Sequence, residues 1–373
     1  METFILDKIN NRTEKVLITS EIQNKYGIGL NNRLIICKPI IDIQINGFCQ
    51  IDFNESNLDE EKVNKVCEQL RNRGIWYIFP TIITNSKENM EQGLQVIYEA
   101  KKKYILCDQM IKGVHLEGPY ISAEDGPRGA HPIQYVTCPD VHQIEKWQKK
   151  YNGLIKIITI APEKLGTENF LKYCREQHIM VSIGHTNANS DQIHRAVLGG
   201  AQCSTHLGNG AHLYLKRHPN YIWDQLSEKE LYASIIVDGH HLPDNVVSVI
   251  ERVKKEKLVL ISDGTQFTGC DAGVYETLIG GKVILDENKR LCMESNQNLL
   301  AGAAMDLLEI LNRIKRDKIL EISYAIDCMT IHPRALLRKS CEFDENEYIV
   351  LCERENDILY IQEGKELLKE LCL

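Results

Sequence analysis

Short apolar runs alternate along most of the chain with polar stretches that carry apolar residues at helical spacing. Eight of the apolar runs are typical of buried strands: 41–45, 76–82, 112–116, 155–160, 180–183, 202–205, 233–237 and 258–262. The stretches between them predict helices, among them 60–73, 87–102, 141–151, 168–177, 189–200 and 243–254. Strands that alternate with helices lie parallel in one sheet, and no glycine-rich dinucleotide fingerprint follows the first strand. The pattern therefore predicts an α/β fold and favours a TIM-like (β/α)8 barrel over an open sheet.

The pattern changes after Gly264. Residues 274–294 predict turns and short strands, and 301–314 predicts a helix. Residues 322–337 predict a second helix that ends at Pro333, and 348–353 with 357–362 predict a hairpin. The first forty residues are β-like. We expect the two termini, 1–39 and 338–373, to form a small β-sandwich-like domain beside a barrel of residues 40–337.

Composition and charge narrow the class of protein. The chain has 373 residues and a formal net charge of −8, and its only basic block is 101–103. This argues against a nucleic-acid surface. No apolar run is long enough to span a bilayer, the N-terminus has no signal pattern, and the thirteen cysteines include no Cys-x-x-Cys pair. We therefore expect a cytoplasmic protein with reduced thiols and neither a membrane nor a nucleic-acid partner.

Two strand-like runs end in histidines. Residues 180–183 lead to His185, and 202–205 lead to His206, with a helix-like stretch between them. Because the carboxyl ends of parallel strands meet at one edge, both imidazoles should converge there, close to Glu117, which ends another strand. One carboxylate and two imidazoles make a three-ligand site for a divalent metal with a position open to water. Each histidine taken alone is as easily a buried structural residue, whereas the three residues together favour the metal site.

Three further polar residues stand at strand ends. Asp263 ends the last strand, where it could take a proton from the attacking water and pass it to a leaving group; its alternative role is a turn or cap. Gln44 and Asn46 end the first strand, where many barrel hydrolases have His-x-His for a second metal. Amides are poor metal ligands beside imidazole. We therefore expect a single metal ion, with Gln44 and Asn46 hydrogen-bonding water in the vacant second-metal position.

Two loops offer groups that suit a bound anion. Glycines flank Asn209 at 208 and 210, so that backbone N–H groups can approach an anion closely. Lys216-Arg217-His218 follows and could complete a phosphate or carboxylate site, although a solvated basic cluster is an equal alternative. His240 and His241 follow the seventh strand and could face a substrate, although we expect one of the two to be only a loop residue.

A set of motifs spread over residues 40–305 now allows a comparison with a known family. It comprises Gln44-Ile-Asn46-Gly47, Phe79-Pro-Thr81, His115-Leu-Glu117-Gly-Pro-Tyr120, Arg128-Gly-Ala-His131, Ala161-Pro-Glu163, Gly184-His185-Thr-Asn-Ala188, Thr205-His206-Leu-x-Asn209, Asp238-Gly-x-His241, Ser262-Asp263 and Leu300-Ala-Gly302. Together, and in this order, they resemble the N-acetylglucosamine-6-phosphate deacetylase family of the amidohydrolase superfamily.

The resemblance implies a role for each matching residue. Glu117, His185 and His206 would bind one divalent metal ion per subunit, zinc first, with iron or another divalent ion as alternatives. Asp263 would activate the water and then protonate the amine, and His131 would hold the acetamide carbonyl.

The resemblance also implies how the sugar phosphate is held. Asn209, the backbone at Gly210, His241 and Arg217 would contact it. In the family the arginine comes from the neighbouring subunit, so that Arg217 would imply a homodimer.

The loops after two of the site residues depart from the family pattern. The family's Leu-Phe-Asn-Ala-Met after the second histidine is here Leu207-Gly-Asn-Gly-Ala211, and the segment 264–273 also differs. We expect a hydrolase that converts N-acetylglucosamine 6-phosphate to glucosamine 6-phosphate and acetate. The alternatives are another N-acyl sugar, an N-acyl amino acid, or a non-catalytic barrel scaffold.

Overall fold

Eight parallel strands form the central sheet of the computed structural model, which describes residues 2–29, 31–277 and 281–373. Neighbouring strands follow one another in the chain: β4 (Ile40–Ile45), β7 (Ile75–Ile83), β8 (Val114–Glu117), β9 (Ile155–Ile160), β10 (Met180–Ile183), β11 (Ala201–Ser204), β12 (Tyr232–Ile235) and β13 (Leu258–Leu260). A parallel bridge between Ile45 and Gly264 joins the first strand to the chain beyond the last one. The sheet is thus closed, and the predicted (β/α)8 barrel is confirmed.

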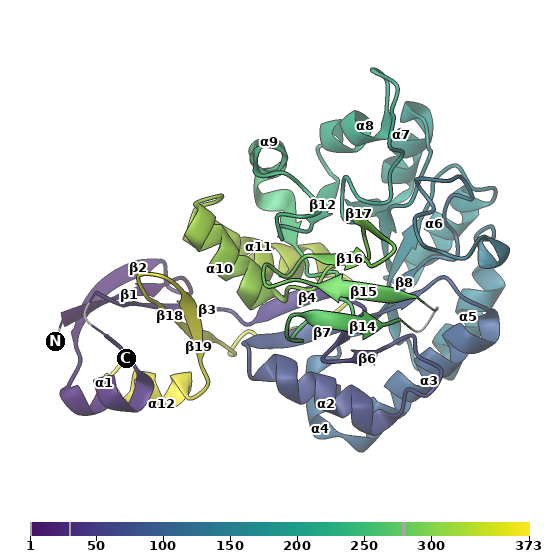
Figure 1. Cartoon of the computed structure of the whole chain (residues 1–373). Helices are drawn as coiled ribbons and strands as arrows, with labels where there is room; N and C mark the ends of the chain where they lie inside the picture. Colours follow the sequence, from purple (N-terminus) through teal and green to yellow (C-terminus); the bar gives the residue numbers. More distant parts are fainter. Residues whose placement is uncertain (1, 30, 278–280) are drawn as a thin grey trace.

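Helices cover the outer face of this barrel (Figure 1). In chain order they are α2 (Glu60–Arg71), α3 (Lys87–Lys103), α4 (Ile105–Met110), α5 (Val141–Lys150), α6 (Thr167–Glu176), α7 (Ser190–Gly199), α8 (Tyr221–Ser227), α9 (Asp244–Lys254), α10 (Leu307–Asp317) and α11 (Ile322–Leu337). In α2, the Asp59 side chain accepts a hydrogen bond from the Lys62 amide and starts the helix, while Val63, Val66 and Leu70 form its buried face. The outer core between helices and strands is built from such faces.

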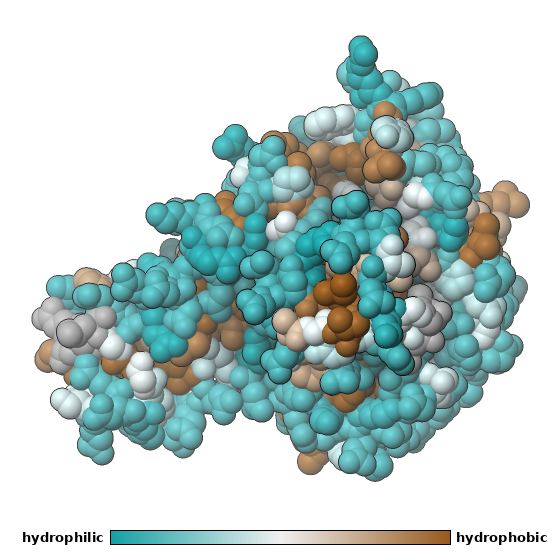
Figure 2. All heavy atoms as spheres, viewed as in Figure 1, coloured by the Kyte–Doolittle hydropathy of each residue, from teal (hydrophilic) through white to brown (hydrophobic). Residues whose placement is uncertain are grey.

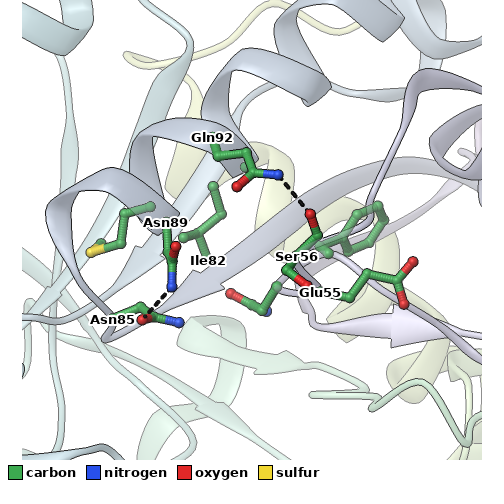
Figure 3. Close-up of a pocket in the computed structure, with 10 residues that line it drawn as sticks. Glu55, Ser56, Ile82, Asn85, Asn89 and Gln92 are labelled. Atoms are coloured by element: carbon green, nitrogen blue, oxygen red, sulfur yellow. Dashed lines mark hydrogen bonds between the residues drawn. The ribbon is translucent and has the colours of Figure 1, made fainter. Parts of the chain in front are cut away.

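Side-chain amides fasten α3 to the loops at its start (Figure 3). Gln92 Nε2 donates to the carbonyl of Ser56 at 2.7 Å, and Asn89 Nδ2 donates to Asn85 Oδ1 at 3.0 Å. These contacts line a small pocket beside Ile82 at the end of β7. They hold the loops that follow β6 (Ile51–Asp52) and β7 against the barrel.

The barrel interior is layered because alternate residues of each strand point inward. An apolar layer lies at the amino-terminal ends of the strands and includes Ile41, Tyr77, Ile157, Met180 and Val259. Two residues further along several strands the buried inward side chains are polar: His115, Thr159, Ser182, Thr205 and Ser234. The site described below lies one step beyond this polar layer.

The two termini pair into one five-stranded sheet at the side of the barrel, where Figure 1 places both chain ends. Its order is β19 (Ile358–Ile361), β18 (Ile349–Glu353), β3 (Arg33–Cys37), β1 (Glu2–Asp7) and β2 (Arg12–Leu17). The predicted pairing of the termini and the hairpin β18–β19 are confirmed. Two helices that the sequence pattern did not indicate, α1 (Ser20–Tyr26) and α12 (Gly364–Glu370), belong to this part. The division at residues 39 and 338 stays a prediction.

A four-stranded antiparallel sheet follows β13. It consists of β14 (Gly273–Glu276), β15 (Lys282–Leu285), β16 (Leu291–Met293) and β17 (Asn296–Leu300). The first three agree with the short strands predicted over 274–294. Positions 278–280 of that prediction lie outside the described residues. Figure 2 shows a largely hydrophilic face with an apolar cluster over this sheet, on which Val274 and Leu299 are exposed.

Two helix boundaries were predicted wrongly. The helix expected at 301–314 begins only at Leu307, because the Asp306 carboxylate accepts from the amides of Leu308 and Glu309 and caps it there. Residues before this cap pair instead with the chain after β13, where the Thr265 amide donates to the Ala303 carbonyl. Helix α11 does not end at Pro333 but runs through it, since the helix is buried on both sides of the proline and this packing outweighs one lost hydrogen bond. Among the described ranges, no helix is both long and apolar enough to cross a membrane.

Candidate metal centre and active site

Three side chains that the sequence predicts as metal ligands meet at the carboxyl end of the barrel. Glu117 Oε1 lies 3.1 Å from His185 Nε2 and 2.7 Å from His206 Nε2, and the two imidazole nitrogens are 3.1 Å apart. All three residues are buried, and their ligand atoms lie within 4.8 Å of one another. The predicted convergence of strands β8, β10 and β11 on one point is confirmed.

The surroundings of His185 decide which of its nitrogens faces the cluster. His185 Nδ1 donates to the backbone carbonyl of Pro127 at 2.8 Å, because a carbonyl can only accept. In the neutral ring Nε2 then carries a lone pair, and it points at the Glu117 carboxylate and at His206. Such an outer hydrogen bond is the usual means by which proteins orient a metal-binding imidazole.

The donor set fits a divalent cation. Burial works to raise the pKa of Glu117, but its contacts with His185 and His206 hold that pKa well below its usual value, so the carboxylate is charged. The buried carboxylate and the imidazole lone pairs converge within hydrogen-bond distance. The negative potential between them favours a bound cation. Glu117, His185 and His206 can therefore hold one metal ion.

Asp263 faces this cluster from the chain after β13. Its Oδ1 accepts hydrogen bonds from Gln44 Nε2 at 3.1 Å and from Asn46 Nδ2 at 2.8 Å, and Gln44 also donates to Glu117 Oε1 at 2.8 Å. The two amides of the first strand thus bind the carboxylates themselves. Burial, with the charge of Glu117, raises the pKa of Asp263 to about 6, which suits a group that takes up and returns a proton near neutral pH.

Left-handed backbone turns place three of these side chains. His185, His206 and Asp263 have φ angles of 50°, 29° and 47°. Residues without glycine's freedom adopt this region only where the surrounding structure enforces it. The chain therefore turns sharply just beyond three barrel strands and directs the side chains over the barrel axis.

Gly210 lies against a predicted metal ligand and should not accept a side chain. A Cβ atom there would lie 2.7 Å from His185 Nδ1, and its φ is +54°. We expect Gly210→Ala to displace His185 and to weaken metal binding by roughly 10-fold to 100-fold. Gly208→Ala is the matched control, because its φ is also positive and its Cβ would meet only the end of the Leu242 side chain. Equal metal affinities of the two variants would contradict this reading of Gly210.

His131 lies beside the cluster on the loop after β8. Its ring centroid is 4.5 Å from that of His185, and its buried Nδ1 has no hydrogen-bond partner among the described residues. Burial lowers the pKa of His131 to about 3, so the ring is neutral. A neutral imidazole with a free nitrogen at this place can bind a polar group of a substrate.

The four residues expected to hold the substrate lie at different depths. Asn209 and Gly210 lie on the loop that follows His206, and the buried side chain of His241 is hydrogen-bonded through Nδ1 to Asp238 Oδ2 at 2.7 Å. Arg217 instead lies exposed, on the loop that projects before α8 in Figure 1. The structure brings the first three toward one end of the barrel, and Arg217 makes no side-chain contact among those of the described residues.

Sequence reasoning missed several groups that position the site. The Pro127 carbonyl orients His185, the Ser234 hydroxyl accepts from the His206 amide at 2.9 Å, and Asp238 orients His241. His131 is held by Arg128, whose Nη1 donates to its carbonyl at 2.9 Å. Only Asp238 left a signal in the sequence, because Asp-Gly-His-His places acid and imidazole three positions apart. The carbonyl contact depends on loop geometry and leaves none.

Comparison with known proteins finds deacetylases of hexosamine phosphates among the relatives of this chain. No protein-family model matches the chain. The N-acetylglucosamine-6-phosphate deacetylase of Caenorhabditis elegans is 30% identical over 321 residues, which cover 83% of this chain and 75% of the relative. The N-acetylgalactosamine-6-phosphate deacetylase of Shewanella sp. (strain ANA-3) is 26% identical over 301 residues, 80% of this chain and 73% of the relative.

A solved structure agrees with the fold. The N-acetylglucosamine-6-phosphate deacetylase of Thermotoga maritima superposes with a TM-score of 0.75 at 22% identity, over 97% of both chains. The sequence likeness to the Caenorhabditis elegans enzyme extends over most of both proteins. The chain belongs to the N-acetylglucosamine-6-phosphate deacetylase family.

Proposed function

We propose that this chain is a metal-dependent amide hydrolase that removes acetate from N-acetylglucosamine 6-phosphate and yields glucosamine 6-phosphate. The observation that carries the proposal is the convergence of Glu117, His185 and His206 at one end of the barrel, with Asp263 facing them. Family membership supplies the substrate class.

A divalent cation held by the three ligands would polarise the acetamide carbonyl. It would also lower the pKa of a water molecule, so that the water could lose a proton and attack near neutral pH. Zinc suits one carboxylate and two imidazoles, and so do iron and other divalent ions. The metal content of protein purified without added metal tests this point. One divalent ion per subunit is expected, and a metal-free active enzyme would refute it.

The protein groups share the proton transfers. Asp263 takes the proton of the attacking water on its carboxylate and returns it to the amine as the C–N bond breaks. His131, whose ring packs against that of His185, holds the carbonyl oxygen of the acetamide. Gln44 and Asn46 keep Asp263 aimed at the cluster through the hydrogen bonds described above.

Phosphate binding is assigned to Asn209, Gly210, His241 and Arg217, the last from a second subunit. Leu213 and Tyr214, four and three residues before Arg217, are each 88% exposed. Apolar side chains at the tip of a projecting loop are typical of a contact with another protein. We therefore propose a homodimer in which each loop reaches the site of the partner.

Mixed dimers test the role of Arg217. Arg217→Ala should raise KM for the phosphorylated substrate by roughly 10-fold or more, because a buried charge-assisted contact to phosphate contributes about 1.5–3 kcal/mol. When Arg217→Ala subunits are mixed with inactive Asp263→Asn subunits, one site of each mixed dimer has both native residues. Activity should then recover toward a quarter of the wild-type level. No recovery in verified mixed dimers would place Arg217 in its own subunit's site or outside any site.

A second substrate has support from the relatives and from the loops. Among the relatives is an N-acetylgalactosamine-6-phosphate deacetylase, and the loops at 207–211 and 264–273 depart from the family pattern. Acetate release should be measured from both hexosamine phosphates, from unphosphorylated N-acetylglucosamine and from an N-acyl amino acid. The proposal requires the highest kcat/KM for N-acetylglucosamine 6-phosphate. A higher value for another compound assigns the chain to that substrate.

The remaining alternative is a barrel that serves only as a scaffold. It predicts neither stoichiometric metal nor turnover of any compound in this panel, so the same measurements decide it. We place the enzyme in the cytoplasm, on the composition described above and on its sugar-phosphate substrate class.

A further inference from the structure

A chain of buried polar side chains crosses the barrel directly beneath the metal ligands. His115, one inward step before Glu117 on β8, contacts the Thr159 hydroxyl of β9 through Nε2 at 2.8 Å. Thr159 Oγ1 lies 2.8 Å from Thr205 Oγ1, and Thr205 donates to Ser182 Oγ at 2.6 Å. The four side chains are at most 2% exposed, except Thr205 at 4%.

This row of hydrogen-bonded side chains also contacts a fifth strand. His115 Nδ1 lies 3.2 Å from the backbone carbonyl of Ile43, the residue before Gln44 on β4. The connected side chains therefore join β4, β8, β9, β10 and the chain at the end of β11. Four of these strands carry or lead to Gln44, Glu117, His185 and His206. None of the four polar side chains touches the ligand atoms in the contacts of the described residues, and none has a part in the reaction proposed above.

We propose that His115 is a positioning residue that sets the spacing of the metal ligands through this cross-barrel chain. Its ring links the backbone carbonyl of Ile43 on β4 to the Thr159 hydroxyl on β9, and Thr159 in turn contacts Thr205, which follows β11. Buried polar groups of this kind are costly unless they are paired, and once paired they fix one arrangement of the strands around them. This inference rests on the metal centre of the proposed function.

The position of these hydrogen-bonded side chains indicates how their loss would change the metal centre. Thr205 directly precedes His206, and His115 and Glu117 share one face of the same strand. A shift of these strands by a few tenths of an ångström changes the distances between Glu117 Oε1 and the two Nε2 atoms. Outer-shell partners of metal ligands typically change metal affinity by about 10-fold to 100-fold when they are removed.

The test is the dissociation constant for Zn²⁺, measured on full-length protein by competition with a chelator. His115→Phe keeps a planar aromatic ring and removes both polar contacts, and we expect its affinity to fall by roughly 10-fold to 100-fold. His115→Gln restores a partner for Thr159 and should recover most of that loss. Thr159→Val, which keeps the side-chain shape, should act in the same direction as His115→Phe and serves as the second variant if the phenylalanine protein fails to fold.

A control separates positioning from general loss of stability. Met180→Ala opens a cavity in the apolar layer of the same barrel, on the strand that leads to His185, without touching the polar chain. It should lower the Tm of the metal-free protein and leave the Zn²⁺ affinity unchanged. Wild-type affinity in both His115→Phe and Thr159→Val, or an equal loss in Met180→Ala, overturns the inference while the metal centre stands. A wild-type protein that binds no metal overturns the proposed function and this inference with it.

Discussion

Replacing Asp263 by asparagine is expected to reduce kcat by about 100-fold to 10,000-fold, the range for a lost general acid–base. The asparagine side chain keeps an oxygen at the place of Oδ1, so that Gln44 and Asn46 retain their acceptor. It cannot take up the proton of the attacking water. Because Asp263 is not among the three ligands, the variant should bind metal as the wild type does. The measurements are kcat with N-acetylglucosamine 6-phosphate and the metal content of the same preparation.

Glu117→Gln provides the comparison, because it changes the same functional group on a predicted ligand. Here metal content and kcat should fall together, whereas in Asp263→Asn only kcat should fall. An Asp263→Asn protein that retains a tenth or more of the wild-type kcat with metal bound would exclude Asp263 as the proton carrier. A metal-free Asp263→Asn protein would instead make the aspartate a ligand.

The parallel barrel is predictable from sequence because each strand is buried on both faces. The run 155–160 holds four isoleucines without a regular alternation of apolar and polar positions, and helix-spaced stretches on either side identify it as a parallel strand. The antiparallel sheet β14–β17 gives a weaker signal, since its strands are short and half-exposed. The start of α10 was misplaced because the sequence pattern is also insufficient there. Periodicity alone does not reveal that residues before Asp306 bond to the chain after β13.

The metal centre is predictable for a related reason. Glu117, His185 and His206 are polar residues that end apolar runs, and topology brings such ends together. The groups that hold these ligands in place cannot be predicted from the sequence, because Thr159, Thr205 and Ser182 resemble ordinary small residues of a strand. Their hydrogen bonds depend on which face of the barrel they occupy and on the register between strands. Outer contacts of this kind follow only from coordinates.

Asp42 is the buried carboxyl group that should affect stability most. It lies in the barrel with Oδ1 accepting from the amides of Gln44 and Ser262 at 3.3 Å each, while Oδ2 has no partner among the described residues. Burial raises its pKa to about 7 from the usual 3.8. The folded protein therefore holds a proton that the unfolded chain has released between these two values. The stabilisation by this proton is complete below about pH 4 and is lost as the pH rises through 7.

Asp42→Asn should remove this pH dependence. The difference in unfolding free energy between variant and wild type should grow in favour of the variant from pH 4 to pH 7, by up to about 4 kcal/mol at 1.36 kcal/mol per pKa unit. Urea unfolding of metal-free protein at several pH values measures it. Asp59→Asn, which keeps the cap of α2 while removing one exposed charge, is the control. The amide of the variant shifts the unfolding free energy by an amount that does not depend on pH, so it does not affect the change of the difference with pH. A difference that stays constant from pH 4 to pH 7 would show that Asp42 is ionised in the folded barrel. Its two amide donors would then outweigh its burial.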